Sequence, residues 1–263
     1  MSASTVVSTP TIGNGIAVSP AAPDHAPVPE PLTILWRGPS LVAVDKPAGL
    51  AVHRGWAEDD GDVINELAAA QLGQPVFPVH RLDRATSGVL LLALSSATAA
   101  AMQQAFQAGA VEKTYLAIVR GTPPASGTID HPVPRSKELV GPEHRVPAVT
   151  DFETLATGRV VALDRSFSLV RCWPRTGRQH QIRRHFKHLS HPIVGDVNYG
   201  KGDINRHFRA HMGLARLALH ATRLRLAPLG EAAPVPIDAP LPPDFSEALR
   251  RLGIAPTPPF SPI

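Results

Sequence analysis

One short polar segment of the sequence carries the side chains best suited to covalent chemistry. It runs His80-Arg81-Leu82-Asp83-Arg84-Ala85-Thr86-Ser87-Gly88 and lies between two apolar stretches. Arginines flank Asp83 there, and a neighbouring guanidinium favours the ionised form of a carboxylate. An ionised and oriented carboxylate can act as a nucleophile, as it does in glycosidases. The alternative is a turn aspartate that is ion-paired and has no chemical role.

A second candidate segment is basic and opens a predicted helix. It runs Pro174-Arg175-Thr176-Gly177-Arg178-Gln179-His180-Gln181-Ile182-Arg183-Arg184-His185. We expect Thr176 to cap a helix that extends to Leu189, because apolar residues recur at helical spacing from Ile182 onward. The amide groups of a helix N-terminus, together with nearby arginines, favour the binding of phosphate. A solvated basic helix face without a ligand is the alternative.

The third candidate is a pair of residues in a strand predicted over 111–120. Lys113 and Tyr115 are two positions apart, so both side chains point to the same face of that strand. A tyrosine at such a place could stack on a nucleobase or accept a proton. A tyrosine that belongs to the hydrophobic core is the alternative.

Histidine and cysteine usage bears on metal binding and on disulfides. Six histidines fall at close spacing: His180, His185, His188, His191, His207 and His211. No carboxylate at ligand spacing accompanies them, so we expect no metal site. Cys172 is the only cysteine, which excludes an intrachain disulfide and a multi-cysteine zinc site. Its apolar neighbours predict a position in the core.

Charge is distributed unevenly along the chain. The formal net charge is +4, but residues 171–225 contain twelve Arg or Lys and only two Asp, so this segment carries +10. Concentrated positive charge indicates a surface for a polyanion, nucleic acid first, with a solvated basic face as the alternative. No stretch is long and apolar enough to span a membrane, and residues 1–20 lack a secretory signal. We therefore expect a cytoplasmic protein.

The strands and helices that must position these segments are indicated by apolar periodicity. Strands are predicted over 32–36, 41–45, 76–79, 89–94, 111–120, 150–155, 168–173, 216–221 and 223–226. Helices are predicted over 62–72 (with Asp62 as N-cap), 96–107, 176–189 and 245–252, and a loop over 127–147. Strands outnumber helices without strict alternation, which predicts an α+β fold with a mostly antiparallel mixed sheet flanked by helices. We expect a disordered Pro/Ala-rich leader (1–30), a catalytic domain (31–230) and a Pro-rich C-terminal tail with one short helix (231–263).

From the His80-to-Gly88 motif onward the sequence resembles the RluA-type family of pseudouridine synthases. Further blocks match in the same order at 113–115, 175–185, 191–196 and 216–221, and the match runs from about 32 to 229. The resemblance implies a pseudouridine synthase fold, here without the S4-like domain that family members often carry. It also implies an enzyme that isomerises uridine to pseudouridine in RNA and needs neither a cofactor nor a metal.

The same resemblance implies roles for individual residues. Asp83 would be the catalytic carboxylate, and Arg183 would pair with it and hold it ionised. Tyr115 would stack on a target base that has been flipped out of its helix, and could take the proton from C5. Arg81 would fill the gap left in the base stack, and Leu219 would line the pocket. The basic segment would hold the RNA backbone.

Within the family the chain is most similar to the branch that modifies uridine 65 of tRNA. The similarity rests on residues 52–56, 80–96, 147–150 and 213–217, while the leader and the short loop between 132 and 147 depart from that branch. A synthase acting on large-subunit ribosomal RNA is the nearest alternative. An RNA-binding protein without catalysis and an RNA N-glycosidase that releases uracil are more distant ones. We expect the protein to act as a monomer.

Overall fold

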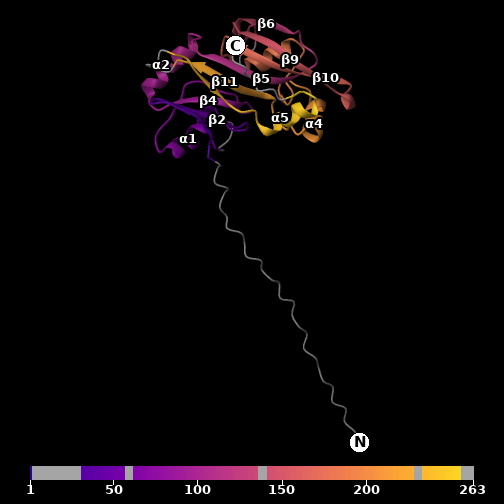
Figure 1. Ribbon diagram of the computed structural model, residues 1–263, viewed down its shortest axis with the longest axis horizontal. Coiled ribbons are helices and arrows are strands. Elements are labelled where there is room, and N and C mark those ends of the chain that lie inside the picture. Colours follow the sequence, from indigo (N-terminus) through magenta and orange to yellow (C-terminus); the bar gives the residue numbers. More distant parts are fainter. Residues whose placement is uncertain (2–30, 57–61, 136–140, 228–232, 256–263) are drawn as a thin grey trace. The chain divides into compact units, whose positions relative to one another are not determined.

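One large mixed β-sheet organises the part of the chain that the structure describes (Figure 1). In this computed structural model the described residues are 1, 31–56, 62–135, 141–227 and 233–255. Apart from Met1, the predicted leader over 1–30 lies outside these residues. The described residues from 31 onward form one compact unit.

Strands and helices of the described chain have the following bounds. The large sheet contains β1 (Ile34–Arg37), β2 (Leu41–Lys46), β3 (Phe77–Pro78), β4 (Ser87–Ala93), β5 (Glu112–Arg120), β6 (Ser126–Asp130), β9 (Val149–Val160), β10 (Arg165–Pro174), β11 (Leu219–Leu226) and β12 (Val235–Asp238). A separate short pair consists of β7 (Val133–Pro134) and β8 (Arg145–Val146). The α-helices are α1 (Ile64–Leu72), α2 (Ser96–Gln107), α3 (Gln181–His188), α4 (Gly202–His211) and α5 (Pro243–Arg251).

The strand order of the large sheet is β1-β2-β4-β11-β5-β10-β9-β6, with β3 added beside β4 and β12 beside β11. Neighbouring strands are antiparallel except β4 and β11, which are parallel. The predicted α+β fold with a mostly antiparallel mixed sheet is therefore confirmed. Strand β4 begins with Ser87 and Gly88, the last two residues of the motif around Asp83. It lies next to β11, where Ser87 pairs with His220, 133 positions later in the sequence.

Apolar side chains cover both faces of the sheet around β2, β4 and β11. Along β4 alternate residues enter two different clusters, with Leu90 and Leu92 in the larger one and Leu91 in the smaller one. Helix α2 contributes Met102 to the smaller cluster, whereas α1, α3, α4 and α5 contribute to the larger one. Figure 1 shows α1 and α2 toward the end of the sheet that contains β2 and β4, and α4 and α5 toward the other end. Burial on both faces explains why β4 is apolar from Val89 to Ala93.

Several predicted elements differ from those observed, for local physical reasons. Asp62 is not the N-cap of α1: Val63 precedes the helix, and the amides of Ile64 and Asn65 donate to the carbonyls of residues 51 and 52 instead. The two strands predicted over 216–221 and 223–226 are one strand, β11, with an irregularity in its pairing to β5 between Ala221 and Arg223. Part of the predicted loop over 127–147 forms strands, of which β6 is an edge strand with one buried residue.

The C-terminal part of the described chain, predicted as a tail with one helix, also contributes to the sheet and the core. Strand β12 pairs with β11, and Phe245, Ala248 and Leu249 of α5 are buried in the larger cluster. Helix α4 was not predicted, because only Ile204 and Phe208 mark its buried side. No helix of the described residues combines the length and the apolar character needed to cross a membrane.

Candidate active site

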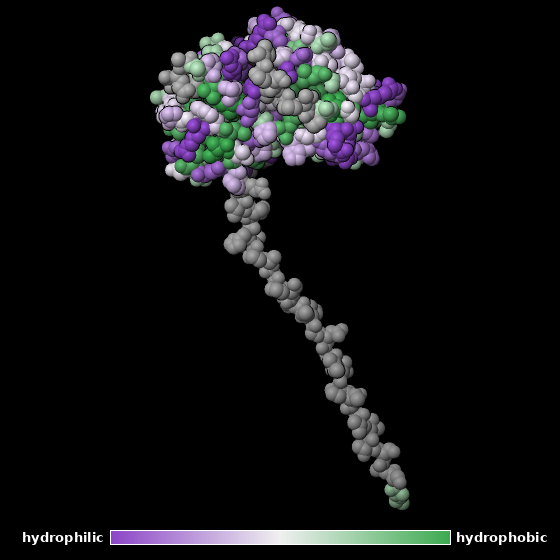
Figure 2. Space-filling model, viewed as in Figure 1, coloured by the Kyte–Doolittle hydropathy of each residue, from purple (hydrophilic) through white to green (hydrophobic). Residues whose placement is uncertain are grey.

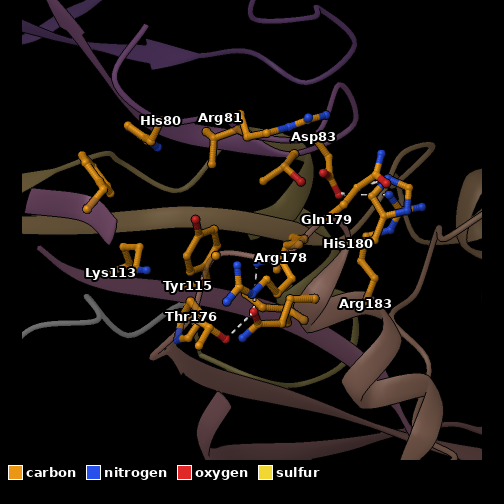
Figure 3. A pocket seen from close by; sticks show the side chains of 18 of the residues that line it. His80, Arg81, Asp83, Lys113, Tyr115, Thr176, Arg178, Gln179, His180 and Arg183 are labelled. Carbon is orange, nitrogen blue, oxygen red and sulfur yellow. Dashed lines mark hydrogen bonds and ion pairs between the residues drawn. The ribbon is translucent and has the colours of Figure 1, made fainter. Parts of the chain in front are cut away.

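A cleft of about 680 Å³ gathers the residues that the sequence predicted to form a site (Figure 3). Its walls come from the loop before β4, the C-terminal end of α2, strand β5, the start of β11, and the connection from β10 into α3. All five predicted site residues line it: Arg81, Asp83, Tyr115, Arg183 and Leu219. Segments more than 100 positions apart in sequence, such as those of Arg81 and Leu219, therefore meet around one space.

The loop that carries Asp83 is fixed from behind by a lysine that the sequence reasoning missed. Lys46 ends β2, is fully buried, and donates hydrogen bonds from Nζ to the carbonyls of Pro47 (2.8 Å), Arg84 (3.1 Å) and Thr86 (2.8 Å). Two of these carbonyls belong to the Asp83 loop. Burial lowers the pKa of Lys46 to about 7, although the charge of Asp83 opposes this shift. A lysine closing an apolar strand was the only available signal in the sequence.

Gly88 allows the two strands nearest the site to approach closely. Its φ is +112°, and a Cβ at this position would lie 2.1 Å from the carbonyl oxygen of Ala221. A residue with a side chain cannot adopt this arrangement without moving the backbone of β11. The glycine that ends the motif therefore brings the Asp83 loop next to the start of β11, where Leu219 lies.

Asp83 is the outer member of a chain of charges that runs into the protein. Arg183 Nη1 donates to Asp83 Oδ2 at 3.0 Å, and Arg183 also binds Asp196 through Nε (2.7 Å) and Nη2 (3.0 Å). Exposed fractions of the side chains are 16% for Asp83, 6% for Arg183 and 0% for Asp196. Burial disfavours the charge of Arg183, but the two carboxylates outweigh it and raise the pKa of Arg183. The predicted pairing of Arg183 with Asp83 is confirmed.

Asp196, which the sequence reasoning missed as a site residue, holds this arginine in place. Its Oδ1 also accepts hydrogen bonds from the backbone amides of Asn198 (2.9 Å) and Tyr199 (3.0 Å). A carboxylate that is fully buried must be satisfied by such partners. The bidentate contact then fixes the orientation of the guanidinium, and so the position of the third donor that reaches Asp83.

The connection between β10 and α3 differs from the prediction. Thr176 is not the N-cap, because α3 begins at Gln181 and is preceded by His180 in the left-handed conformation. Thr176 Oγ1 instead accepts from the amide of Val149 and donates to Gln181 Oε1. The amide of Arg178 donates to the same Gln181 oxygen, at 3.0 Å. These bonds hold residues 175–180 as a folded loop, which forms one wall of the cleft.

Tyr115 and Lys113 project from the same face of β5, as predicted, and both line the cleft (Figure 3). Tyr115 is buried, and burial together with the charge of Asp83 raises its pKa. Lys113 is half-buried, and burial lowers its pKa. Its ammonium has no hydrogen bond or ion pair with any residue that the structure describes.

His80 and α2 form the part of the cleft wall near Lys113. The His80 ring stacks on Phe106, with 4.6 Å between ring centroids, and its Nε2 accepts a hydrogen bond from the amide of Leu91 at 2.9 Å. Burial, assisted by the charge of Lys113, lowers the pKa of His80 to about 3. The imidazole is therefore uncharged at neutral pH.

The positive charge of residues 171–225 is balanced in space much more than in sequence. Among the described residues, six of its twelve cations contact carboxylates outside the segment: Arg171 with Glu153, Arg175 with Asp151, Arg183 with Asp83, Arg216 with Asp244, Arg223 with Asp238 and Arg225 with Glu112. In Figure 2 the hydrophilic residues of the visible face form separate patches. These ion pairs leave less unpaired positive charge in the segment than its +10 indicates, and the predicted surface for a polyanion stays a prediction.

The histidines considered as metal ligands are dispersed. His185 contacts Thr150 and the carbonyl of His131, and His188 stacks on the His131 ring at 3.7 Å. His207 and His211 lie on α4 with 4.8 Å between their rings. Among the residues with described positions, no three His, Cys, Asp or Glu side chains form a group that could hold a metal ion. Cys172 is buried in the core, as predicted, and burial raises the pKa of its thiol.

Comparison with solved structures assigns the fold to a class. The human RNA pseudouridylate synthase domain containing 4 has a TM-score of 0.67 and 28% sequence identity, with 84% of this chain and 93% of that chain covered. The human RNA pseudouridylate synthase domain containing 1 has a TM-score of 0.65 and 28% identity, with 81% and 86% covered. The predicted pseudouridine synthase fold is thus confirmed.

Sequence comparison then gives the family. A family model described as RNA pseudouridylate synthase matches residues 40–188. The tRNA pseudouridine synthase C of Pasteurella multocida is 44% identical over 205 residues, which cover 73% of this chain and 84% of that protein. The tRNA pseudouridine synthase C of Salmonella typhimurium is 40% identical over 236 residues, which cover 84% and 90%. The chain belongs to the RNA pseudouridylate synthase family.

Proposed function

We propose that this protein converts a uridine of tRNA to pseudouridine, with Asp83 as the catalytic carboxylate. The observation that carries the proposal is the hydrogen bonding of the two Asp83 carboxylate oxygens within the cleft. Its Oδ2 is held by Arg183, whereas its Oδ1 accepts no hydrogen bond from the residues that the structure describes. One oxygen is therefore fixed and the other is available to a substrate.

The chemistry of the isomerisation matches a site with one reactive carboxylate. The bond between N1 and C1′ breaks, the uracil turns, and C5 forms the new bond to C1′. C5 loses one proton and N1 gains one, so atoms and electrons balance without a co-reactant. Uracil stays in the cleft and is a tolerable leaving group, so the second carboxylic acid of a glycosidase is unnecessary.

The remaining cleft residues support binding of a flipped nucleotide. Tyr115 presents an aromatic ring beside Asp83, which fits stacking on the uracil. Because its pKa is raised, the phenol is protonated at neutral pH, which supports stacking more than the tyrosinate base needed for direct removal of the C5 proton. Leu219 adds apolar contact, and Arg81 is exposed at the rim, where it can enter the gap left in the base stack.

Lys113 extends this site toward the RNA backbone. It is a half-buried cation without a partner in the described chain, and it lies on the same strand face as Tyr115. A phosphate of the target nucleotide or of its neighbour would supply the missing negative charge. We assign Lys113 to phosphate binding and not to the chemical step.

Support for a tRNA substrate comes from the relatives, which are named as tRNA pseudouridine synthases and match most of the chain. Position 65 of tRNA is the target that we propose, and the chain is proposed to act as a monomer. Large-subunit ribosomal RNA is the alternative substrate, because the cleft residues serve a flipped uridine from either RNA equally well.

The decisive experiment measures tritium release from transcripts labelled at uridine C5. Unmodified tRNA and large-subunit ribosomal RNA are assayed side by side with the wild type and with Asp83→Ala. Release from tRNA alone, absent in the variant, supports the proposal. Release from ribosomal RNA alone changes the substrate but keeps the reaction. Free uracil with an abasic site would indicate an N-glycosidase, and binding without turnover would indicate a non-catalytic RNA-binding protein.

A further inference from the structure

We propose that His180 is a positioning residue for Asp83, set in place by a hydrogen-bond relay from Arg184 through Tyr199. The inference rests on the proposed role of Asp83 and adds to it a group that orients the carboxylate. His180 lies between the loop wall of the cleft and α3, and its ring faces Asp83 (Figure 3).

The backbone of His180 is strained in a way that its local role does not explain. It has φ 53° and ψ 25°, a left-handed conformation that costs a residue with a Cβ about 1 kcal/mol or more. It precedes the first residue of α3, yet its side chain makes no capping hydrogen bond. Glycine or asparagine would suit this position better on local grounds. The contacts of its side chain, and not its local backbone role, therefore offer an explanation for a histidine here.

The imidazole of His180 bridges a tyrosine and the catalytic carboxylate. Nδ1 lies 3.1 Å from the hydroxyl of Tyr199, and Nε2 lies 3.8 Å from Asp83 Oδ2. The two rings meet edge to face, with 5.8 Å between centroids, and only 8% of the His180 side chain is exposed. The buried ring thus has one nitrogen facing Tyr199 and the other facing Asp83.

The direction of the hydrogen bonds follows from the groups involved. Arg184 Nε contacts the Tyr199 oxygen at 2.9 Å, and a guanidinium can only donate. With that donor on the oxygen, the single hydroxyl hydrogen of Tyr199 is best used toward His180 Nδ1. When the ring is uncharged, an accepting Nδ1 places its proton on Nε2. The relay therefore turns an N–H of His180 toward Asp83.

Tyr199 is itself well placed to set this direction. Its amide donates to Asp196 Oδ1, and the guanidinium groups of Arg183 and Arg184 lie 5.2 Å and 5.9 Å from its ring centroid. Asp196 thus supports both the arginine that binds Asp83 and the tyrosine that orients His180.

The consequence for Asp83 is control over which oxygen faces the substrate. Rotation of an aspartate carboxylate about its last torsion is soft, so a second contact to the oxygen that Arg183 already holds restricts the carboxylate further. Arg183 binds Oδ2, and His180 approaches the same Oδ2 from another side. The 3.8 Å distance is too long for a hydrogen bond, and we expect it to shorten when RNA fills the cleft. Oδ1 then remains directed at the reacting carbon.

The test compares Tyr199→Phe with His180→Phe and with His188→Phe, a control at the other end of α3. We expect Tyr199→Phe to lower kcat about tenfold and leave KM for RNA within about twofold, because orientation and not binding is lost. His180→Phe should lower kcat at least as much, and His188→Phe should match the wild type. Histidine ¹⁵N NMR should show the Nε2-protonated tautomer in the wild type and a mixture in Tyr199→Phe.

Two results would overturn the relay: wild-type kcat in folded Tyr199→Phe, or an Nδ1-protonated His180 in the wild type. Thermal unfolding of each variant shows whether it is folded, and the tautomer measurement on the wild type needs no variant. Full activity of Asp83→Ala would instead remove the proposed function itself. An inactive Asp83→Ala with a fully active Tyr199→Phe would remove only the relay.

Discussion

The two ends of the cleft differ in how their charges are satisfied. At one end Asp83, Arg183 and Asp196 form a continuous chain of contacts no longer than 3.0 Å. At the other end Lys113 has no partner among the described residues, and the neighbouring His80 is uncharged at neutral pH. The ion-pair chain at the first end is already formed before substrate arrives, as a reacting group requires. The second lacks an anion, which the RNA would supply.

The largest effect is expected from Asp83→Asn, because it removes the reactive charge and keeps the shape. We expect turnover to fall by at least about 10⁴-fold, as for other catalytic nucleophiles. RNA binding should stay within about threefold, because the cations and aromatic ring that contact RNA are unchanged. Tritium release and filter binding on the same preparation measure both quantities. Substantial turnover would remove Asp83 from the reaction.

Arg183→Met should damage both activity and stability. It leaves the carboxylate of Asp196 buried without its cation, which typically costs about 3–5 kcal/mol of unfolding free energy. The double variant Arg183→Met with Asp196→Asn should recover part of this loss, because the buried charge is then absent, but it should not recover turnover. Urea unfolding and single-turnover assays measure the two effects. A single variant as stable as the wild type would mean that the ion-pair chain is not closed as described.

Local features of the sequence predicted much of the fold and the outer part of the site. The helix over 96–107 was predicted with the bounds of α2, since Ser95 provides a side-chain cap through the amide of Thr98. The apolar run of β4 and the strand face shared by Lys113 and Tyr115 also follow from residues close in sequence. Asp83 was found because its motif is contiguous.

The inner part of the site depends on contacts that no local pattern shows. Lys46 donates to carbonyls 38 and 40 positions away. Lysine is usually exposed, so its residue type gives no sign of this buried role. The start of α3 was predicted wrongly because Thr176 does not cap the helix. Its hydroxyl accepts instead from the amide of Val149, 27 positions earlier, which only the assembled sheet brings close to it. The same hydroxyl donates to Gln181. Ion pairs with residues outside segment 171–225 likewise offset part of its +10 charge, and no local pattern shows those partners.

Lys113→Met tests the other end of the cleft and should affect binding more than chemistry. We expect KM for RNA to rise about tenfold with kcat within about threefold, and the salt dependence of binding to weaken by roughly one phosphate contact. Lys187→Met removes the same charge from an exposed position on α3 and serves as the control. Equal effects of the two variants would mean that only overall charge matters. A large loss of kcat in Lys113→Met would place this lysine with the reacting groups.

The smallest effect at neutral pH is expected from His80→Gln, whose amide oxygen can still accept from the Leu91 amide. The pKa of His80 is about 3 in the folded protein, because of burial and Lys113, against about 6.5 when unfolded. Between these values the unfolded chain binds a proton that the native state does not, so native stability falls as pH decreases below 6.5. The unfolded variant has no imidazole to bind this proton, so its unfolding free energy should fall less steeply with decreasing pH. The two slopes should differ by about 1.4 kcal/mol per pH unit.

Urea unfolding of both proteins between pH 7 and pH 5 measures this difference. Asp45, whose pKa burial raises to about 6, titrates in the same range, but it does so in both proteins and cancels in the comparison. Identical pH profiles would show that His80 takes up its proton without unfolding. Protonated His80 would then be a second cation beside Lys113 at low pH. The difference between this end, which lacks an anion, and the ion-paired end at Asp83 would be larger in acid. Diverging profiles would show that Lys113 is the only one of the two groups able to carry charge toward the RNA.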